Sequence, residues 1–208
     1  MGPIIGPLVI AGISVKEENV QKLRDIEVKD SKLLTQKQRE FLFKKIIKIV
    51  EDYKYFIIEP EEIDNALNSQ ELNLNKLEAI NQAKIINFLK PDKAIIDCPS
   101  PNIKSYTNYL DIFLKHKPNI VMEHKADVNY PECSAASIIA KCIREEEVAK
   151  LKKKYNIEFG SGYMSDERTQ KFLEANHSEP KFDKLFRKSW LPYKNHKLKQ
   201  VNLLDFKK

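Results

Sequence analysis

Residues 74–101, LNKLEAINQAKIINFLKPDKAIIDCPSP, place a helix directly before a strand. Apolar residues recur at helical spacing from Leu74 to Leu89, which predicts an amphipathic helix. The short apolar run at 94–96 predicts a buried strand that ends at Asp97, because the prolines at positions 99 and 101 interrupt any longer strand. The unit is therefore a helix followed by a strand that ends in a carboxylate.

The segments on either side repeat this alternation of strands and helices. Apolar and β-branched runs predict strands at residues 8–15, 53–58 and 119–123. Capping residues and helical spacing predict helices at residues 35–50, from 60 onward, and at 103–114, 134–155 and 166–176. The order predicts an α/β or α+β fold in one domain over residues 1–195, followed by a tail at 196–208.

The composition is that of an ordinary globular domain of 208 residues. Hydrophobic residues make up 42% and charged residues 32%, which argues against a disordered chain and against a membrane protein. No apolar run approaches the roughly 18 residues of a membrane-spanning helix, and the first residues lack the pattern of a signal peptide. The three cysteines form no C-x-x-C pair, so we expect neither a disulfide scaffold nor a zinc site, in a cytoplasmic protein.

The net charge of +6 is concentrated at one end of the chain. Residues 181–208 carry a net charge of +7, and the other 180 residues carry a net charge of −1. A basic segment suits a phosphate backbone. A lysine-rich tail that only keeps the chain soluble is the alternative, and charge alone leaves both open.

Two features can carry chemistry. Asp97 and Asp127 each lie just past a short apolar strand, where rigid strands position side chains next to loops. Two converging carboxylates suit a hard divalent ion such as Mg²⁺ or Mn²⁺. The alternative is that both are ordinary turn and cap residues.

The second feature is the small-residue helix at 134–144, SAASIIAKCIR. Small residues allow close backbone approach at a helix start, where N–H groups bind phosphate. Lys141 and Arg144 lie three residues apart on one face and can hold a nucleic-acid backbone. A tightly packed helix with two solvated cations is the alternative.

Several motifs now occur together in a fixed order. They are Gly2-Pro3, residues 29–32 (KDSK), Ile96-Asp97, residues 124–127 (HKAD), Tyr130-Pro131, residues 134–141 and residues 160–163 (GSGY). In this combination the chain resembles the archaeal type of ribonuclease HII, the type 2 ribonuclease H family, over about residues 2–190. The resemblance implies a ribonuclease H-like mixed sheet flanked by helices, with a C-terminal helical extension.

The resemblance also implies an activity. It implies an endonuclease that cuts the RNA strand of RNA–DNA hybrids and nicks DNA at embedded ribonucleotides, in ribonucleotide excision repair. Such an enzyme is a cytoplasmic monomer that uses four carboxylates and Mn²⁺ or Mg²⁺ in two-metal-ion hydrolysis, leaving 5′-phosphate and 3′-hydroxyl ends.

Individual residues match the motifs of this family. Asp97 and Asp127 match its third and fourth carboxylates, so they are the predicted catalytic and metal-binding residues. The predicted substrate-binding residues are Gly2, Ser31, Lys32, Lys141, Arg144 and Tyr163. Tyr163 matches a tyrosine that packs on the sugar at the RNA–DNA junction, where only the 2′-hydroxyl separates RNA from DNA.

The chain departs from the family pattern at its start. Family members begin with a strand that carries D-E-A-G-R-G-P, whereas here Gly2-Pro3 match only G-P and Met1 stands at the arginine. We expect that the central strand of a five-stranded sheet, with two of the four carboxylates, is missing because of a misassigned gene start or a shortened segment. Hybrid cleavage should then be impaired. A catalytically dead nucleic-acid-binding protein is the alternative.

The tail contains a candidate partner motif. Gln200, Leu203 and Phe206 have the spacing of the sliding-clamp-binding peptide found in many archaeal relatives. One helical turn would bring Leu203 and Phe206 side by side as anchors. Lys207 stands where a second aromatic residue is usual, and a frayed tail is the alternative.

Overall fold

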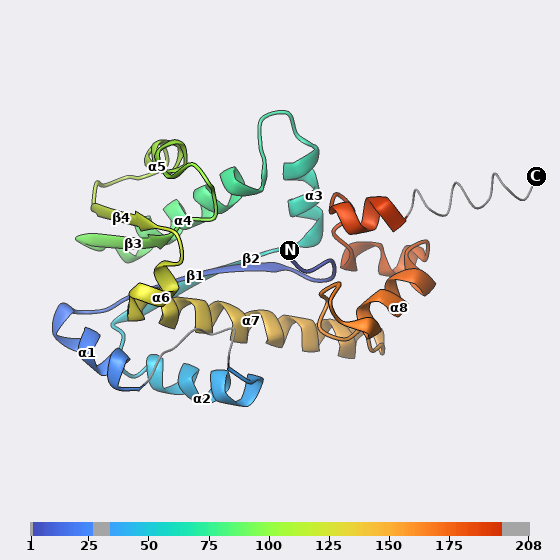
Figure 1. Cartoon of the computed structure of the whole chain (residues 1–208), viewed down its shortest axis with the longest axis horizontal. Helices are drawn as coiled ribbons and strands as arrows, with labels where there is room; N and C mark the ends of the chain where they lie inside the picture. Colours follow the sequence, from blue (N-terminus) through green and yellow to red (C-terminus); the bar gives the residue numbers. More distant parts are fainter. Residues whose placement is uncertain (1, 27–33, 197–208) are drawn as a thin grey trace, which may run out of the picture. The chain divides into compact units, whose positions relative to one another are not determined.

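The computed structural model describes residues 2–26 and 34–196 and divides into two compact units (Figure 1). The strand unit consists of Val9–Ile57 and Leu74–Arg144. The terminal unit consists of Met1–Leu8, Ile58–Asn73 and Glu145–Lys208. A single domain over residues 1–195 stays a prediction.

The strand unit is built on two separate two-stranded sheets. β1 (Leu8–Ser14) pairs with β2 (Asp52–Ile58). β3 (Lys93–Asp97) runs parallel to β4 (Asn119–Glu123), and their register places Asp97 opposite Glu123. Among the described residues, no strand joins these two pairs. The expected loss of a central strand stays a prediction.

Helices of the strand unit cover these strands. They are α1 (Glu17–Asp25), α2 (Gln36–Ile46), α4 (Leu74–Leu89), α5 (Ile103–Asp111), α6 (Ala126–Asn129) and the first part of α7 (Pro131–Tyr155). A capping box between Thr35 and Gln38 begins α2, and Asn102 caps α5. Among the described residues, no helix is both long and apolar enough to cross a membrane.

The strand unit has two apolar clusters. The first joins α1, α2 and α7 through the fully buried Leu23, Ile46 and Ile138. Alternate residues of β1 and β2 pack against it, namely Val9, Ala11, Ile13, Tyr53, Tyr55 and Ile57. The second joins α4, β3 and α5, with Ala83, Ala94, Ile96, Tyr106 and Leu110 among its buried members. Helices therefore lie against the faces of the strands.

The start of α7 corrects the sequence prediction. We expected a loop up to Cys133 and a helix that begins after Ser134, but α6 lies within that loop and α7 begins at Pro131. Proline is favoured in the first helical turn because its φ angle is already helical. The Ser134 N–H donates to the Tyr130 carbonyl at 3.1 Å, so this N–H is part of the helix and is not offered to a phosphate.

The terminal unit has an aromatic core. It contains α3 (Pro60–Asn68), the second part of α7, α8 (Glu167–Asn176) and the 3₁₀ helix η1 (Pro180–Leu185). Phe172 lies at its centre, with ring centroids 5.7 Å from Phe159 and 5.3 Å from Phe182. Ile4 and Ile5 are fully buried in this core, so the N-terminal segment is packed between sequence-distant elements.

Candidate active site

Two carboxylates end neighbouring parallel strands. Asp97 is the last residue of β3 and Glu123 the last residue of β4, and they face each other in the register. The Cys98 N–H donates to the Glu123 carbonyl at 2.8 Å, which holds the two strand ends together beyond the last pair. Carboxyl ends of parallel strands are where α/β sheets place functional groups.

Asp127 is brought to the same place by a tight turn after β4. Lys125 adopts a left-handed conformation (φ 58°) and reverses the chain into α6. The Ala126 N–H then donates to Asp97 Oδ1 at 3.2 Å. Asp127, the next residue, is buried with 8% of its surface exposed, whereas Asp97 is exposed. The structure thus brings together the two aspartates singled out in the sequence.

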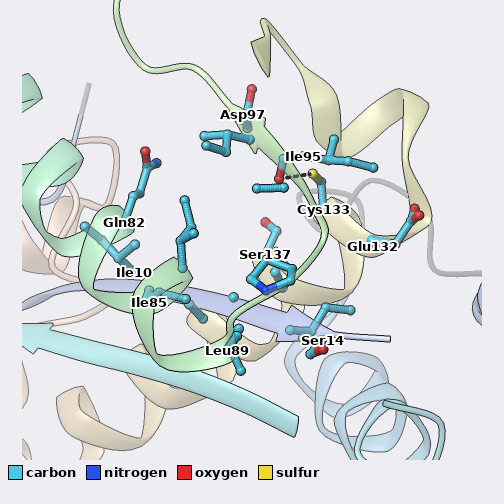
Figure 2. Close-up of a pocket in the computed structure, with 18 of the residues that line it drawn as sticks. Ile10, Ser14, Gln82, Ile85, Leu89, Ile95, Asp97, Glu132, Cys133 and Ser137 are labelled. Atoms are coloured by element: carbon cyan, nitrogen blue, oxygen red, sulfur yellow. Dashed lines mark hydrogen bonds between the residues drawn. The ribbon is translucent and has the colours of Figure 1, made fainter. Parts of the chain in front are cut away.

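The thiol of Cys133 reports on the charge of this region. Burial, first of all, and then the negative charges of Glu132, Asp97, Asp127 and Glu123 raise the pKa of Cys133 to about 12. Its Sγ–H donates to the Ile95 carbonyl at 3.4 Å, and Figure 2 shows this contact below Asp97. The negative charges of four carboxylates therefore act on the Cys133 thiol at the start of α7. The electrostatic potential of this region is negative, which favours cations.

Sequence reasoning did not single out Glu123. Tyr130 donates its hydroxyl to Glu123 Oε1 at 2.7 Å, and the Asn129 amide donates to Oε2 at 3.3 Å. The hydrogen bond from the Tyr130 hydroxyl to Glu123 is the main reason why the pKa of Tyr130 is raised. The sequence did contain a signal for Glu123. The strand predicted at residues 119–123 ends in this carboxylate, just as the preceding strand ends in Asp97.

Helix α7 leads from the acidic region to the predicted phosphate contacts. Cys133, Ser137 and Lys141 follow one another at intervals of four residues, so they share one face of the helix. At 1.5 Å per residue, Lys141 lies about 12 Å and Arg144 about 16 Å along the axis from Cys133. Both cations are half-buried. The acidic region at the start of α7 and the two cations thus lie about two to three turns apart on one helix.

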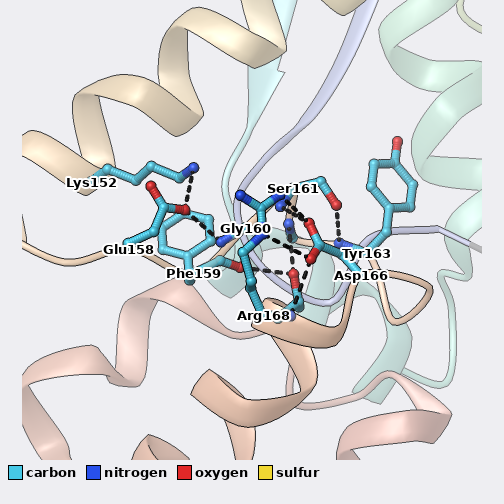
Figure 3. Close-up of polar contacts among 10 residues, drawn as sticks. Lys152, Glu158, Phe159, Gly160, Ser161, Tyr163, Asp166 and Arg168 are labelled. Carbon is cyan, nitrogen blue, oxygen red and sulfur yellow. Dashed lines mark hydrogen bonds and ion pairs between the residues drawn. The ribbon is translucent and has the colours of Figure 1, made fainter.

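Tyr163 lies in a tight loop of the terminal unit (Figure 3). Gly160 and Gly162 have φ angles of 70° and 82°, which favour glycine. Asp166 caps α8, accepts from the Ser161 N–H at 2.8 Å and pairs with Arg168 at 2.9 Å. These bonds, with that to Arg168 first, lower the pKa of Asp166.

The remaining predicted residues fall in different places. Gly2 lies against Trp190 in the terminal unit, where a Cβ on Gly2 would come within 2.8 Å of the indole ring. Ser31 and Lys32, and the clamp-binding residues Gln200, Leu203 and Phe206, lie outside the described residues. The roles of all these residues stay predictions.

The donor set of the two aspartates fits a hard divalent ion. Asp97 and Asp127 offer carboxylate oxygens, which Mg²⁺ and Mn²⁺ prefer. Within residues 2–26 and 34–196, no group of three or more His, Cys, Asp or Glu side chains is arranged to hold a metal ion. Mg²⁺ is commonly held by one or two carboxylates together with substrate phosphates. The pair therefore fits an ion that binds with the substrate.

Three comparisons with known proteins point to the same family. The family model of ribonuclease HII matches residues 1–192. Ribonuclease HII of Pyrococcus furiosus is 44% identical over 192 residues, which cover 91% of this chain and 84% of that protein. The crystal structure of ribonuclease H2 from Pyrococcus horikoshii OT3 superposes with a TM-score of 0.84 at 42% identity, covering 95% of this chain and 93% of the other.

A second solved structure shows a relative together with a partner protein. It is the complex of PCNA with RNase HII from Archaeoglobus fulgidus. Its match to this chain has a TM-score of 0.75 and 39% identity, and it covers 84% of this chain and 81% of the other. The likeness thus extends over most of both chains.

Proposed function

The chain belongs to the ribonuclease HII family and has the ribonuclease H-like fold, and from this we propose that it is an endoribonuclease that cleaves the RNA strand of RNA–DNA hybrids. We extend the proposal to DNA duplexes with embedded ribonucleotides, as in ribonucleotide excision repair. The observation that carries it is the hydrogen bond that draws the α6 backbone onto Asp97 and so brings Asp127 beside it.

In this proposal the chain's own groups position the substrate. Asp97 and Asp127 would hold one or two Mn²⁺ or Mg²⁺ ions, and these ions would supply the Lewis-acid chemistry of a hydrolysis that leaves 5′-phosphate and 3′-hydroxyl ends. The Ala126 N–H keeps one Asp97 oxygen in place. Lys141 and Arg144 hold the backbone phosphates further along α7. Gly2, Ser31, Lys32 and Tyr163 contact the nucleic acid near the junction.

A cleavage assay tests the catalytic role. Labelled RNA–DNA hybrid and duplex DNA with a single ribonucleotide are incubated with Mn²⁺ or Mg²⁺ and the parent chain, Asp97→Asn, Asp127→Asn or Asp111→Asn. Asp111 is an exposed aspartate on α5 and serves as the matched control. We expect cleavage to disappear in the first two variants and to persist at the parent rate in the control. Parent-like cleavage by Asp97→Asn would refute the assignment.

The activity of the chain is proposed to be low. The described residues contain no third acidic ligand arranged with the aspartate pair, which also favours a second candidate function, a nucleic-acid-binding protein without activity. Hybrid binding without any metal-dependent cleavage would establish this second candidate. Rapid cleavage in Mg²⁺ alone would exclude it.

The contact with phosphate is tested separately from cleavage. The hybrid affinity of Lys141→Gln and Arg144→Gln is measured as a function of salt concentration. Each variant should lower the slope of log K against log salt by about one, because each removes about one phosphate contact. Lys150→Gln is the control, since this exposed lysine of the same helix pairs with Glu146 and Glu147.

A sliding clamp is the proposed protein partner. The support is the solved PCNA complex of the Archaeoglobus fulgidus relative and the spacing of Gln200, Leu203 and Phe206. We expect a purified archaeal PCNA to retain the chain on a column and to lose it after Phe206→Ala. Equal retention of both would count against the motif. Without its partner, the chain is proposed to be a cytoplasmic monomer. Gel filtration tests the oligomeric state.

A further inference from the structure

Two lysines and two phenylalanines of the strand unit form a mixed cluster between β2 and α4. Lys54 Nζ lies 5.6 Å from the ring centroid of Phe56 on its own strand and 4.7 Å from that of Phe88 on α4. Lys84 Nζ, four residues before Phe88 on α4, lies 5.6 Å from the Phe56 centroid. Each element therefore brings a lysine to the aromatic ring of the other, within the range of cation–π interactions. We call these four residues the Lys–Phe cluster.

The alternation of β2 explains where the Lys–Phe cluster lies. Tyr53 and Tyr55 pack on the apolar cluster of α1, α2 and α7. Successive side chains of a strand point to opposite faces, so Lys54 and Phe56 lie on the other face of β2. Phe56 is half-buried there, and 52% of the surface of Phe88 is exposed. An aromatic ring is therefore open to solvent beside two cations.

The Lys–Phe cluster carries positive charge that no carboxylate balances directly. In the described part of the chain, neither Lys54 nor Lys84 forms an ion pair. Asp52 precedes Lys54 by two residues, and its side chain accepts from the backbone of the next residue at 2.7 Å. Glu78 is the only acidic residue of α4, and it lies about 15 Å along the helix axis from Phe88. The charge therefore favours an anionic ligand.

The Lys–Phe cluster is distinct from the candidate active site. Phe88 belongs to the last turn of α4, and four residues separate it from Lys93, where β3 begins. Asp97 is the last residue of β3, and four steps along a strand span about 13 Å. The cluster thus lies toward the start of β3, whereas the candidate active site lies at its other end.

We propose that the Lys–Phe cluster is a binding site for single-stranded nucleic acid, separate from the site that cleaves the hybrid. A base stacks on the exposed ring of Phe88, and Lys54 and Lys84 contact the neighbouring phosphates. Aromatic rings combined with a positive surface are the arrangement that binds single strands without sequence preference. In a duplex the bases are already stacked on one another, so the ring favours a single strand. DNA and RNA share this chemistry.

Fluorescence anisotropy of labelled oligonucleotides tests the stacking contact. The probes are decamers of thymidylate and of uridylate, in EDTA to prevent cleavage. Phe88→Leu keeps an apolar side chain without the ring and should weaken binding about tenfold, or about 1.4 kcal/mol, as expected for one lost stacked base. Phe88→Trp should restore the affinity. Phe41→Leu is the matched control and should bind like the parent, since Phe41 is 60% exposed and has only Lys45 over its ring, at 4.5 Å.

The salt dependence of binding tests the two lysines. Lys54→Gln and Lys84→Gln should each lower the slope of log K against log salt by about 0.7, the value for one phosphate of a single strand. Lys45→Gln should leave this slope unchanged. The affinity of Phe88→Leu for an RNA–DNA hybrid should equal that of the parent, so this site and the proposed cleavage site fail or succeed separately.

Circular dichroism checks that each variant folds, and the lysine variants carry the test if Phe88→Leu does not. Equal losses in Phe88→Leu and Phe41→Leu, or no binding of either oligonucleotide by the parent, would overturn the proposal. Labelled decaglutamate has charge but no bases and should bind at least about tenfold more weakly. Equal affinity would assign the cluster to an acidic protein segment and likewise overturn the proposal. Binding of either oligonucleotide through Phe88 supports the site, and the tighter one identifies the preferred sugar.

Discussion

Replacing Thr169 by valine tests how the loop at 160–163 is held. Thr169 is fully buried; its hydroxyl donates to the Phe159 carbonyl at 2.7 Å and accepts from the Gly162 N–H at 3.1 Å. Valine has nearly the same shape but no hydroxyl, so both backbone groups lose this partner. Each buried group left unpaired costs about 1–3 kcal/mol. Because Ser161 beside them is exposed and admits water, we expect a loss of about 2–3 kcal/mol in the free energy of unfolding.

The measurement is urea unfolding followed by tryptophan fluorescence. Trp190 is the only tryptophan of the chain and lies in the same unit as the loop, so its signal reports on that unit. Thr169→Ser is the control, because it keeps the hydroxyl and removes one methyl group, at about 1 kcal/mol. If Thr169→Val proves as stable as Thr169→Ser, the hydroxyl does not hold the loop and the reasoning is wrong.

Three further predictions concern other parts of the chain. Gly12→Ala should lower the free energy of unfolding by about 1–3 kcal/mol in urea titrations, because its Cβ would meet Ile85 at 2.6 Å and an overpacked core is strained. Asp166→Asn should remove a stability contribution that is present above pH 4 and is lost as the pH falls, because the bond to Arg168 lowers the pKa of folded Asp166 below the usual 3.8. The difference in the free energy of unfolding between parent and variant must therefore shrink in acid. At pH 8 only about one Cys133 thiol in ten thousand is ionised at a pKa of about 12, so mass spectrometry should find iodoacetamide labelling far slower than in urea-unfolded chain.

Local patterns predicted some elements to the residue and missed others for physical reasons. Helix α4 and strand β4 have the predicted bounds, because each is a compact apolar pattern between clear breakers. Helix α1 was not predicted, since only Leu23 of its nine residues is buried and its sequence is mostly polar. The start of α7 was placed too late because Ser134 has the chemistry of a cap, whereas Pro131 already begins the helix.

The candidate site was predictable only where one strand end could be judged alone. Asp97 and Asp127 stand out because each follows a short apolar run. The opposition of Asp97 and Glu123 depends on the register between two strands, which no local pattern contains. The acidic surroundings of Cys133 likewise arise from residues on four elements, β3, β4, α6 and α7. The sequence therefore could not predict which distant segments pair and in which register.

The observed start of α7 changes how phosphate can be bound. A helix that began at Ser134 would offer its N–H groups to an anion, but the Ser134 N–H already bonds to the Tyr130 carbonyl. The beginning of the helix is also surrounded by carboxylates, which repel phosphate when no cation lies between them. The proposed phosphate contacts therefore lie further along the helix, at the side chains of Lys141 and Arg144. Side-chain cations release counterions from nucleic acid, with a slope of about 0.9 for each phosphate neutralised, so binding on this face must weaken as salt rises.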